Sequence, residues 1–195
     1  MLTSKFNIIL ASKSPRRQQL LQEMGVSFTI KIKEIVESYP ADLKKEQVAL
    51  YLVELKAREF DNELADNELI ITADTIVCLG EKILGKPKDE KEAFKMLNEL
   101  SGKEHEVITA VYLKTKQKTH SFYDSTSVYF RGISEQSITE YIKNYQPFDK
   151  AGAYGIQENR EEGKNINRFI EKINGSYSNV VGFPIEKLRE KLVAF

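Results

Sequence analysis

One stretch of the chain, residues 69–79 with the sequence LIITADTIVCL, limits the fold more than any other segment. Its residues are mostly apolar and often β-branched, and the run contains Asp74 and the neighbouring Thr75. β-Branched side chains favour strands, and an apolar run without polar alternation is typical of a strand covered on both faces. We therefore predict a central strand here, in a sheet that carries helices on both sides.

Strand and helix patterns alternate along the rest of the chain. Extended segments are predicted at residues 6–11, 27–36, 106–114, 121–130 and 168–173. Helices are predicted at residues 16–24, 43–60, 90–100 and 134–145 and from Pro184 onwards, with a loop at 174–183. Ser14, Asp89 and Ser134 are suitable N-cap residues, and Gly25 ends the first helix.

The fold class that these elements predict is α/β (mixed α+β), a twisted mixed β-sheet flanked by helices. The sheet is mixed because residues 106–114 and 121–130 would pair as a hairpin. We expect one domain over residues 1–195, with room for two lobes. Ligands in such sheets usually bind beyond the strand ends.

The charge balance excludes some partners. The chain has 29 basic and 29 acidic residues, so it has no overall field to attract nucleic acid or an anionic membrane. The single cysteine, Cys78, lies in the apolar run and is expected to be a buried thiol, which suits a reducing compartment. The N-terminal segment resembles neither a signal peptide nor a membrane span. We expect a cytoplasmic protein.

The sequence SKSPRR at residues 12–17 is the first candidate for chemistry. Ser12, Ser14, Arg16 and Arg17 place hydroxyl groups and cations where a helix begins. Cations there oppose the helix dipole by ~0.3–1 kcal/mol each, so an anion such as phosphate would suit the site. The alternative is an ordinary capped helix with two solvated arginines. Residues 7–24 contain no glycine, which excludes a Walker A loop.

Asp74 is the second candidate, because a carboxylate inside an apolar strand is costly to bury unless it binds a metal or a cation or faces an open strand end. The alternative is an aspartate hydrogen-bonded to backbone at a sheet edge. Lys56 and Lys86 are candidate phosphate ligands, and Glu37 is a candidate magnesium ligand. Each of these three is, by itself, more often a surface residue.

The two histidines support neither a zinc site nor a serine hydrolase. His105 and His120 have no cysteine or second histidine at metal-ligand spacing, and no serine lies in a nucleophile-elbow context.

Several segments resemble, in order, the Maf family of nucleoside triphosphate pyrophosphatases, once described as septum-formation proteins. The matching segments are LASKSPRR at 10–17 with LL at 20–21, ADTIV at 73–77, GKP at 85–87, LSG at 100–102, HEV at 105–107, DKAGAYGIQ at 149–157, NGSY at 174–177 and VGFP at 181–184. Because they occur at both ends and in the middle, the resemblance covers nearly the whole chain.

The resemblance implies a deep nucleotide cleft, a divalent metal cation and hydrolysis of triphosphates to a monophosphate and pyrophosphate. The cation would be Mg²⁺, with Mn²⁺ or Co²⁺ as alternatives, bound by Glu37 and Asp74. Asp74 would be the general base, with Arg16 and Lys86 completing the catalytic set. The residues implied to bind the nucleotide are Ser12, Ser14, Arg16, Arg17, Lys56, Thr75, Lys86 and Gln157. Many members form homodimers; we expect no nucleic-acid or membrane partner.

The sequence Ala73-Asp74-Thr75 is similar to the branch of the family that acts on dTTP and UTP, whereas a branch acting on 7-methyl-GTP tends to carry Ser-Asp-Gln there. In the first branch, base selectivity is associated with Arg17, Thr75 and Gln157. Modified pyrimidine nucleotides are further candidate substrates. The chain departs from the family in having Glu158 where glycine is common, followed by a polar segment to residue 164, which we interpret as a loop insertion.

Three alternatives remain at this point. One is a nucleotide-binding regulator of cell division without turnover. Another is a Maf pyrophosphatase with a different base preference, such as 7-methyl-GTP. The third, a nucleic-acid-binding protein, is weakened by the zero net charge.

Overall fold

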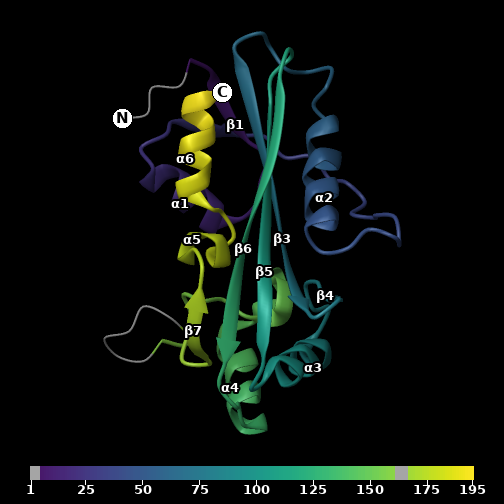
Figure 1. The fold of residues 1–195 in the computed structure, drawn as a ribbon, viewed down its shortest axis with the longest axis vertical. Coiled ribbons are helices and arrows are strands. Elements are labelled where there is room, and N and C mark those ends of the chain that lie inside the picture. Colours follow the sequence, from purple (N-terminus) through teal and green to yellow (C-terminus); the bar gives the residue numbers. More distant parts are fainter. Residues whose placement is uncertain (1–4, 161–166) are drawn as a thin grey trace. The chain divides into compact units, whose positions relative to one another are not determined.

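A computed structural model describes residues 5–160 and 167–195. Within these residues, seven strands form one sheet in the order β2-β1-β3-β5-β6-β7, with β4 paired to β3 (Figure 1). Strand β1 is parallel to β2 and β3, whereas β4 runs antiparallel to β3 and β7 antiparallel to β6. The sheet is therefore mixed and helices accompany it, which confirms the predicted fold class.

The strands are β1 (Asn7–Leu10), β2 (Phe28–Ile30), β3 (Glu68–Leu79), β4 (Lys82–Leu84), β5 (Glu104–Lys114), β6 (Thr119–Phe130) and β7 (Ile170–Asn174). The α-helices are α1 (Pro15–Glu23), α2 (Glu46–Arg58), α3 (Glu90–Leu100), α4 (Glu135–Tyr145), α5 (Tyr177–Val181) and α6 (Ile185–Ala194). Two short 3-10 helices are η1 (Pro147–Asp149) and η2 (Ala151–Ala153). None of the described helices is both long enough and apolar enough to cross a membrane.

The chain divides into two compact units. Unit 1 comprises the described residues up to Thr75 together with Thr109–Asp124 and Gly182–Phe195. Unit 2 comprises Ile76–Ile108 and the described part of Ser125–Val181. The three long strands β3, β5 and β6 contribute residues to both units.

Unit 1 is built around the parallel strands β2, β1 and β3. Helix α2 lies on one side of these strands, and α1 and α6 lie on the other (Figure 1). Ile9 and Ile70 are register partners on β1 and β3, and they pack with Phe60 and Leu64 in a buried cluster. Each such side chain stabilises the fold by about 1.5–3 kcal/mol when fully buried.

Helix α1 begins as the sequence predicts. The Ser14 side chain accepts a hydrogen bond from the backbone N–H of Arg17, and Pro15 occupies the first helical position. Gly25 follows the helix with a φ of +74°, a conformation that glycine adopts without steric cost. The cap at Ser14 and the proline at residue 15 fix the point where the loop after β1 meets α1, and so they fix where Ser12 and Arg17 lie.

Strand β3 is covered on both faces, as predicted. Along its length only Glu68, Thr75 and Leu79 are partly exposed, and Cys78 is buried as expected. Asp74, with 8% exposure, is the buried charged residue of this strand.

Unit 2 has an aromatic core. Phe130 makes edge-to-face contacts with His105, Tyr154 and Phe169, and Tyr141 contacts Phe169. Helices α3 and α4 lie in contact, and their N-caps are the predicted Asp89 and Ser134.

Several element predictions were wrong in detail. The extended segment at 27–36 contains only the short strand β2, and the helix predicted at 43–60 is the shorter α2. The loop predicted at 174–183 contains helix α5, and β4 was not predicted. Of the insertion at 158–164, residues 161–164 lie outside the described part of the chain.

Candidate functional site

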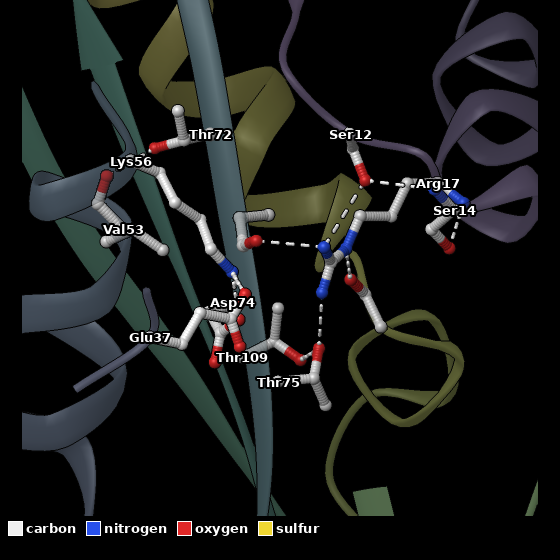
Figure 2. Close-up of polar contacts among 12 residues, drawn as sticks. Ser12, Ser14, Arg17, Glu37, Val53, Lys56, Thr72, Asp74, Thr75 and Thr109 are labelled. Carbon is white, nitrogen blue, oxygen red and sulfur yellow. Dashed lines mark hydrogen bonds and ion pairs between the residues drawn. The ribbon is translucent and has the colours of Figure 1, made fainter. Parts of the chain in front are cut away.

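A group of three charged side chains lies at Asp74 in unit 1 (Figure 2). The Lys56 Nζ atom, from the last turn of α2, is 2.5 Å from Asp74 Oδ1 and 2.8 Å from Glu37 Oε1. The Lys56 and Asp74 side chains are only 16% and 11% exposed. Two carboxylates thus share one ammonium group. The contact with Asp74 is largely shielded from water and is therefore stronger than a surface ion pair, whereas Glu37 reaches Lys56 from the solvent side with 43% of its side chain exposed.

The local sequence accounts for this arrangement. Thr72 Oγ1 donates a 2.7 Å hydrogen bond to the carbonyl oxygen of Val53, which holds α2 against β3. Asp74 is two residues beyond Thr72 and so lies on the same face of the strand, while Lys56 is three residues beyond Val53 and so lies on the same face of the helix. One helix–strand contact therefore brings the two charged groups together.

The loop after β1 is organised by serine hydroxyl groups. Ser12 is buried, and its Oγ accepts hydrogen bonds from the Ser14 backbone N–H at 3.2 Å and from Arg17 Nη1 at 3.4 Å. Lys13 points elsewhere and forms an exposed ion pair with Glu34. The loop thus turns towards the strand that carries Asp74.

Arg17 lies inside the site, bonded to unit 1 residues. Its guanidinium group donates to the carbonyl oxygens of Ala73 at 2.8 Å and Gly182 at 2.9 Å and to Thr75 Oγ1 at 3.0 Å, besides Ser12 (Figure 2). Burial lowers the Arg17 pKa, and the Asp74 carboxylate opposes this effect. The group stays charged, because an arginine does not lose its proton in a protein.

Arg16 precedes Arg17 in the first turn of α1 and is half-buried. Its charge lies close enough to Arg17 to lower the pKa of that residue further. The helix has no acidic residue in its first turn. The start of α1 is therefore a local concentration of positive charge, which suits an anionic ligand.

The carboxylates of Asp74 and Glu37 have the oxygen ligands that a divalent cation requires. Within residues 5–160 and 167–195, no group of three or more His, Cys, Asp or Glu side chains is close enough to hold an ion. Asp74 and Glu37 nevertheless converge on a single positive charge, that of Lys56. Magnesium prefers oxygen ligands and needs only one or two protein carboxylates when substrate phosphates bind it too. The pair fits such a cation.

The predicted site residues are divided between the two units. Unit 1 contains Ser12, Ser14, Arg16, Arg17, Glu37, Lys56, Asp74 and Thr75. Unit 2 contains the other two, Lys86 and Gln157. Lys86 is exposed, in the segment after β4, and Gln157 is half-buried.

Gln157 belongs to a turn that a buried polar network holds in unit 2. The hydroxyl of Tyr141 donates to Glu158 Oε2 at 2.5 Å and accepts from the Gly155 backbone N–H at 3.0 Å. Lys150 Nζ is 2.9 Å from Glu158 Oε1. Burial and the Glu158 carboxylate raise the pKa of Tyr141, so its hydroxyl stays protonated and donates to the carboxylate. Glu158 thus folds back over Gly155 and holds the turn.

Sequence reasoning missed several of these residues. Tyr141 and Lys150 gave no signal as network members, and neither did Thr109, whose hydroxyl lies 3.0 Å from that of Thr75. In the sequence, Glu158 differs from the family pattern, but nothing there indicates its contact with Tyr141. Since these contacts join segments distant in the chain, no local pattern reports them.

His105 has a structural environment. It is buried, its Nε2 lies 2.8 Å from the Tyr154 hydroxyl, and burial lowers its pKa to about 4. The imidazole is therefore neutral at neutral pH and packed among aromatic rings.

The chain is similar to known proteins over nearly its whole length. A model of the family described as Maf-like protein matches residues 7–195. The chain is 46% identical over 188 residues to the dTTP/UTP pyrophosphatase of Flavobacterium johnsoniae, covering 96% of this chain and 94% of that one. It is 48% identical over 192 residues to the dTTP/UTP pyrophosphatase of Flavobacterium psychrophilum, covering 96% and 95%.

A similar fold occurs in a solved structure, that of the Staphylococcus aureus Ham1 protein. The TM-score is 0.51 at 16% identity, covering 96% of this chain and 98% of that chain. At this identity the likeness concerns the fold alone.

Proposed function

The chain belongs to the Maf family, and from this premise we propose that it hydrolyses dTTP and UTP between the α and β phosphates, releasing the monophosphate and pyrophosphate. Relatives that carry this activity in their names are 41–48% identical over nearly the full chain. The observation that carries the proposal is Asp74, a carboxylate enclosed in β3 and held by Lys56 beside Glu37.

Asp74 is the general base in this proposal. A water molecule attacks the α-phosphorus in line with the departing pyrophosphate, and Asp74 accepts the proton of that water. The Lys56 ion pair orients the carboxylate through Oδ1. Arg16, Lys56 and Lys86 neutralise the charge that develops on the pyrophosphate, a form of catalysis that needs position more than covalent chemistry.

Ser12 and Ser14 support phosphate binding. Both hydroxyl oxygens accept hydrogen bonds from backbone N–H groups of the loop and of the start of α1, and each hydroxyl still has its own hydrogen to donate to a phosphate oxygen. A bound divalent cation would neutralise and orient phosphate oxygens, with Asp74 and Glu37 as its protein ligands. We propose Mg²⁺ for this role, with Mn²⁺ or Co²⁺ as alternatives.

Gln157 is proposed to read the base. Its amide can donate and accept, so it can pair with N3–H and one keto oxygen of thymine or uracil. A purine would leave such a site with an unpaired polar group, which costs binding free energy. Modified pyrimidine triphosphates present the same edge and are candidate substrates.

A cytoplasmic homodimer is the proposed state of the protein. The buried position of Cys78, the single cysteine, is compatible with a reducing compartment. Sedimentation equilibrium with and without nucleotide gives the oligomeric state, and a monomer at all concentrations would remove the dimer from the proposal.

The test of function is pyrophosphate release from a panel of triphosphates with Mg²⁺ present. We expect rapid release from dTTP and UTP, and slow release from dATP, dGTP and 7-methyl-GTP. A regulator without turnover would bind dTTP but release no pyrophosphate. Cleavage of 7-methyl-GTP or dGTP faster than of dTTP and UTP would contradict the proposed base preference but not the pyrophosphatase activity.

A further inference from the structure

The backbone that leads into Gln157 is held by side chains from distant parts of unit 2. Gly155 has both of its backbone polar groups bonded to side chains. Its N–H donates to the Tyr141 hydroxyl at 3.0 Å, and its carbonyl oxygen accepts from Asn167 Nδ2 at 3.1 Å. The backbone N–H of Asn167 also donates to the Ile156 carbonyl oxygen at 2.8 Å. Tyr141 and Asn167 therefore fix the two residues that precede Gln157.

Glu158 fixes the turn on the other side of Gln157 in the sequence. Its Oε1 lies 2.9 Å from Lys150 Nζ, and its Oε2 accepts from the Tyr141 hydroxyl at 2.5 Å. Its backbone N–H donates to the Gly155 carbonyl oxygen at 3.2 Å. A Cβ atom at Gly155 would lie 2.9 Å from the Glu158 carboxyl carbon, so any side chain at residue 155 would push the carboxylate from this position. The lack of a side chain at Gly155 thus lets Glu158 close the turn.

The contacts that hold the turn are buried. Asn167 is 0% exposed, Tyr141 1% and Lys150 9%. Asn167 is itself held in place, because its Oδ1 accepts from the Phe169 backbone N–H at 3.0 Å, just before β7. Hydrogen bonds shielded from water are stronger than exposed ones, and a buried amide that lost its partners would be costly. Asn167 and Tyr141 therefore act on the turn and are not open to a ligand.

A fixed turn matters for base recognition because the amide of Gln157 has two different ends. One end donates hydrogen bonds and the other accepts them, so the amide distinguishes one base edge from another only when its direction is set. Rotation of the backbone at residue 157 would turn both ends away from the edge that they pair with. Groups behind a binding side chain can therefore raise selectivity without contacting the ligand, by fixing that side chain in advance.

We propose that Glu158 and Asn167 are positioning residues for Gln157. Through the turn at 155–158 they set the direction of its amide, and so the preference for pyrimidine over purine triphosphates, without touching the nucleotide. The proposal rests on the proposed function in one respect, that Gln157 reads the base. Because Glu158 stands where glycine is common in the family, the family resemblance does not imply this anchor.

The first test measures kcat and KM for dTTP and dGTP in Glu158→Ala. We expect KM for dTTP to rise about five- to tenfold, with KM for dGTP and both kcat values within about threefold of the parent, because the base loses a contact and the chemical step does not. Glu158→Gln keeps an oxygen for the Tyr141 hydroxyl and should restore part of the preference. Glu171→Ala, an exposed carboxylate on β7, is the matched control and should stay within about twofold of the parent.

Asn167→Ala tests the second anchor by the same kinetics. It removes the donor to the Gly155 carbonyl and the acceptor for the Phe169 N–H. We expect the same rise in KM for dTTP of about five- to tenfold, with KM for dGTP nearly unchanged. Asn144→Ala is the matched control, because Asn144 is exposed on α4 in the same unit. It should leave both KM values within about twofold of the parent.

The second test asks if the anchors act through Gln157. In a Gln157→Ala background, adding Glu158→Ala or Asn167→Ala should change the dTTP/dGTP preference by no more than about twofold, because the amide that they position is already gone. Hydrogen exchange of the peptide that spans residues 155–158 measures the turn itself in the nucleotide-free protein. We expect faster exchange in Glu158→Ala and Asn167→Ala than in the two control variants.

Three results would overturn the proposal: an equal rise in KM for dTTP and dGTP in Glu158→Ala, a further loss of preference when Gln157 is already alanine, or unchanged hydrogen exchange in the turn. Thermal unfolding identifies a variant that fails to fold, and the Glu158 variants decide if Asn167→Ala does so. If the parent releases no pyrophosphate, the proposed activity fails by itself, and calorimetric binding of dTTP and dGTP replaces KM in the same comparisons. A parent that binds neither nucleotide overturns both proposals.

Discussion

Asp74 shows how a single buried charge is tolerated in an apolar strand. Removing a carboxylate from water costs several kcal/mol unless a partner compensates for the loss. Lys56 is that partner, and it is shared with Glu37, so the three side chains form one electrostatic unit. Substitutions here are best chosen to preserve shape, since removal of one charge leaves another without its counterpart.

Asp74→Asn should keep the fold and nucleotide binding while lowering turnover by at least ~10²-fold, the scale of a lost general base. The asparagine is isosteric, and Lys56 keeps its ion pair with Glu37. Calorimetric binding of a non-hydrolysable dTTP analogue, together with pyrophosphate release, measures both effects. Turnover within threefold of the parent would remove Asp74 from the mechanism.

Arg16→Ala should weaken triphosphate binding yet change the unfolding free energy of the nucleotide-free protein by no more than about 0.5 kcal/mol. The reason is that a cation in the first turn of α1 opposes the helix dipole, so its loss costs little without an anion. Urea unfolding with and without nucleotide checks this. A large loss in the nucleotide-free protein would mean that Arg16 has a structural role.

At the scale of elements, helix starts were predictable and short elements were not. Ser14, Asp89 and Ser134 cap their helices as expected, because a cap is a local interaction. Helix α5 was missed because it depends on contacts distant in the chain: the Asn179 side chain donates to the Val107 carbonyl and to Thr126 Oγ1.

In the candidate site too, local features were predictable from the sequence and contacts between distant segments were not. The charged residues were predictable as types from the family resemblance, whereas the acceptors of Arg17 were not. These include the carbonyl groups of Ala73 and Gly182, which lie 56 and 165 positions from Arg17. A backbone carbonyl has no residue-type signature, so only the folded chain reveals such a partner.

The turn around Gln157 gives an element-scale prediction. Tyr141→Phe removes the hydroxyl that joins the Gly155 N–H to the Glu158 carboxylate, leaving a partly buried donor without this acceptor. We expect a loss of about 1–3 kcal/mol in unfolding free energy and a smaller preference for dTTP over dGTP.

Tyr145→Phe is the control, because its ring stacks on Tyr141 from the same helix but is 39% exposed. It should change stability by less than about 0.5 kcal/mol. Equal losses of unfolding free energy in the two variants would show that the Tyr141 hydroxyl does not hold the turn. An unchanged dTTP/dGTP preference in Tyr141→Phe would show that the network does not position Gln157.

At the scale of the whole molecule, His105 links stability to pH. Its folded-state pKa of about 4 lies below the ordinary value of 6.5, so between these values the unfolded chain binds more protons than the folded one. Stability from this residue is thus present above pH 6.5 and lost as the pH falls towards 4.

His105→Gln should remove this dependence while keeping a polar group that can bond Tyr154. Between pH 6 and pH 5, the parent should lose about 1 kcal/mol more unfolding free energy than the variant. Urea unfolding of both proteins at each pH gives the difference. Parallel pH curves would show that His105 does not titrate on unfolding.

Base selectivity is a property of the whole protein with its nucleotide bound, and Gln157 is the residue proposed to read the base. Gln157→Ala should reduce the dTTP/dGTP preference by more than it lowers dTTP hydrolysis, because it removes the amide proposed to read the base and leaves the proposed general base, Asp74, in place. Pyrophosphate release from both substrates measures the ratio. An unchanged ratio would assign base recognition elsewhere.

The shared position of Lys56 has a consequence for the order in which ligands arrive. Its ammonium group already neutralises Asp74 and Glu37, so a free cation that approaches the nucleotide-free protein must compete with Lys56 for the two carboxylates. A triphosphate that arrives with its cation also brings anionic oxygens, with which Lys56 can form an ion pair in place of the carboxylates. We therefore expect nucleotide and metal to bind as one complex, in which the cation replaces Lys56 as the positive charge beside Asp74 and Glu37.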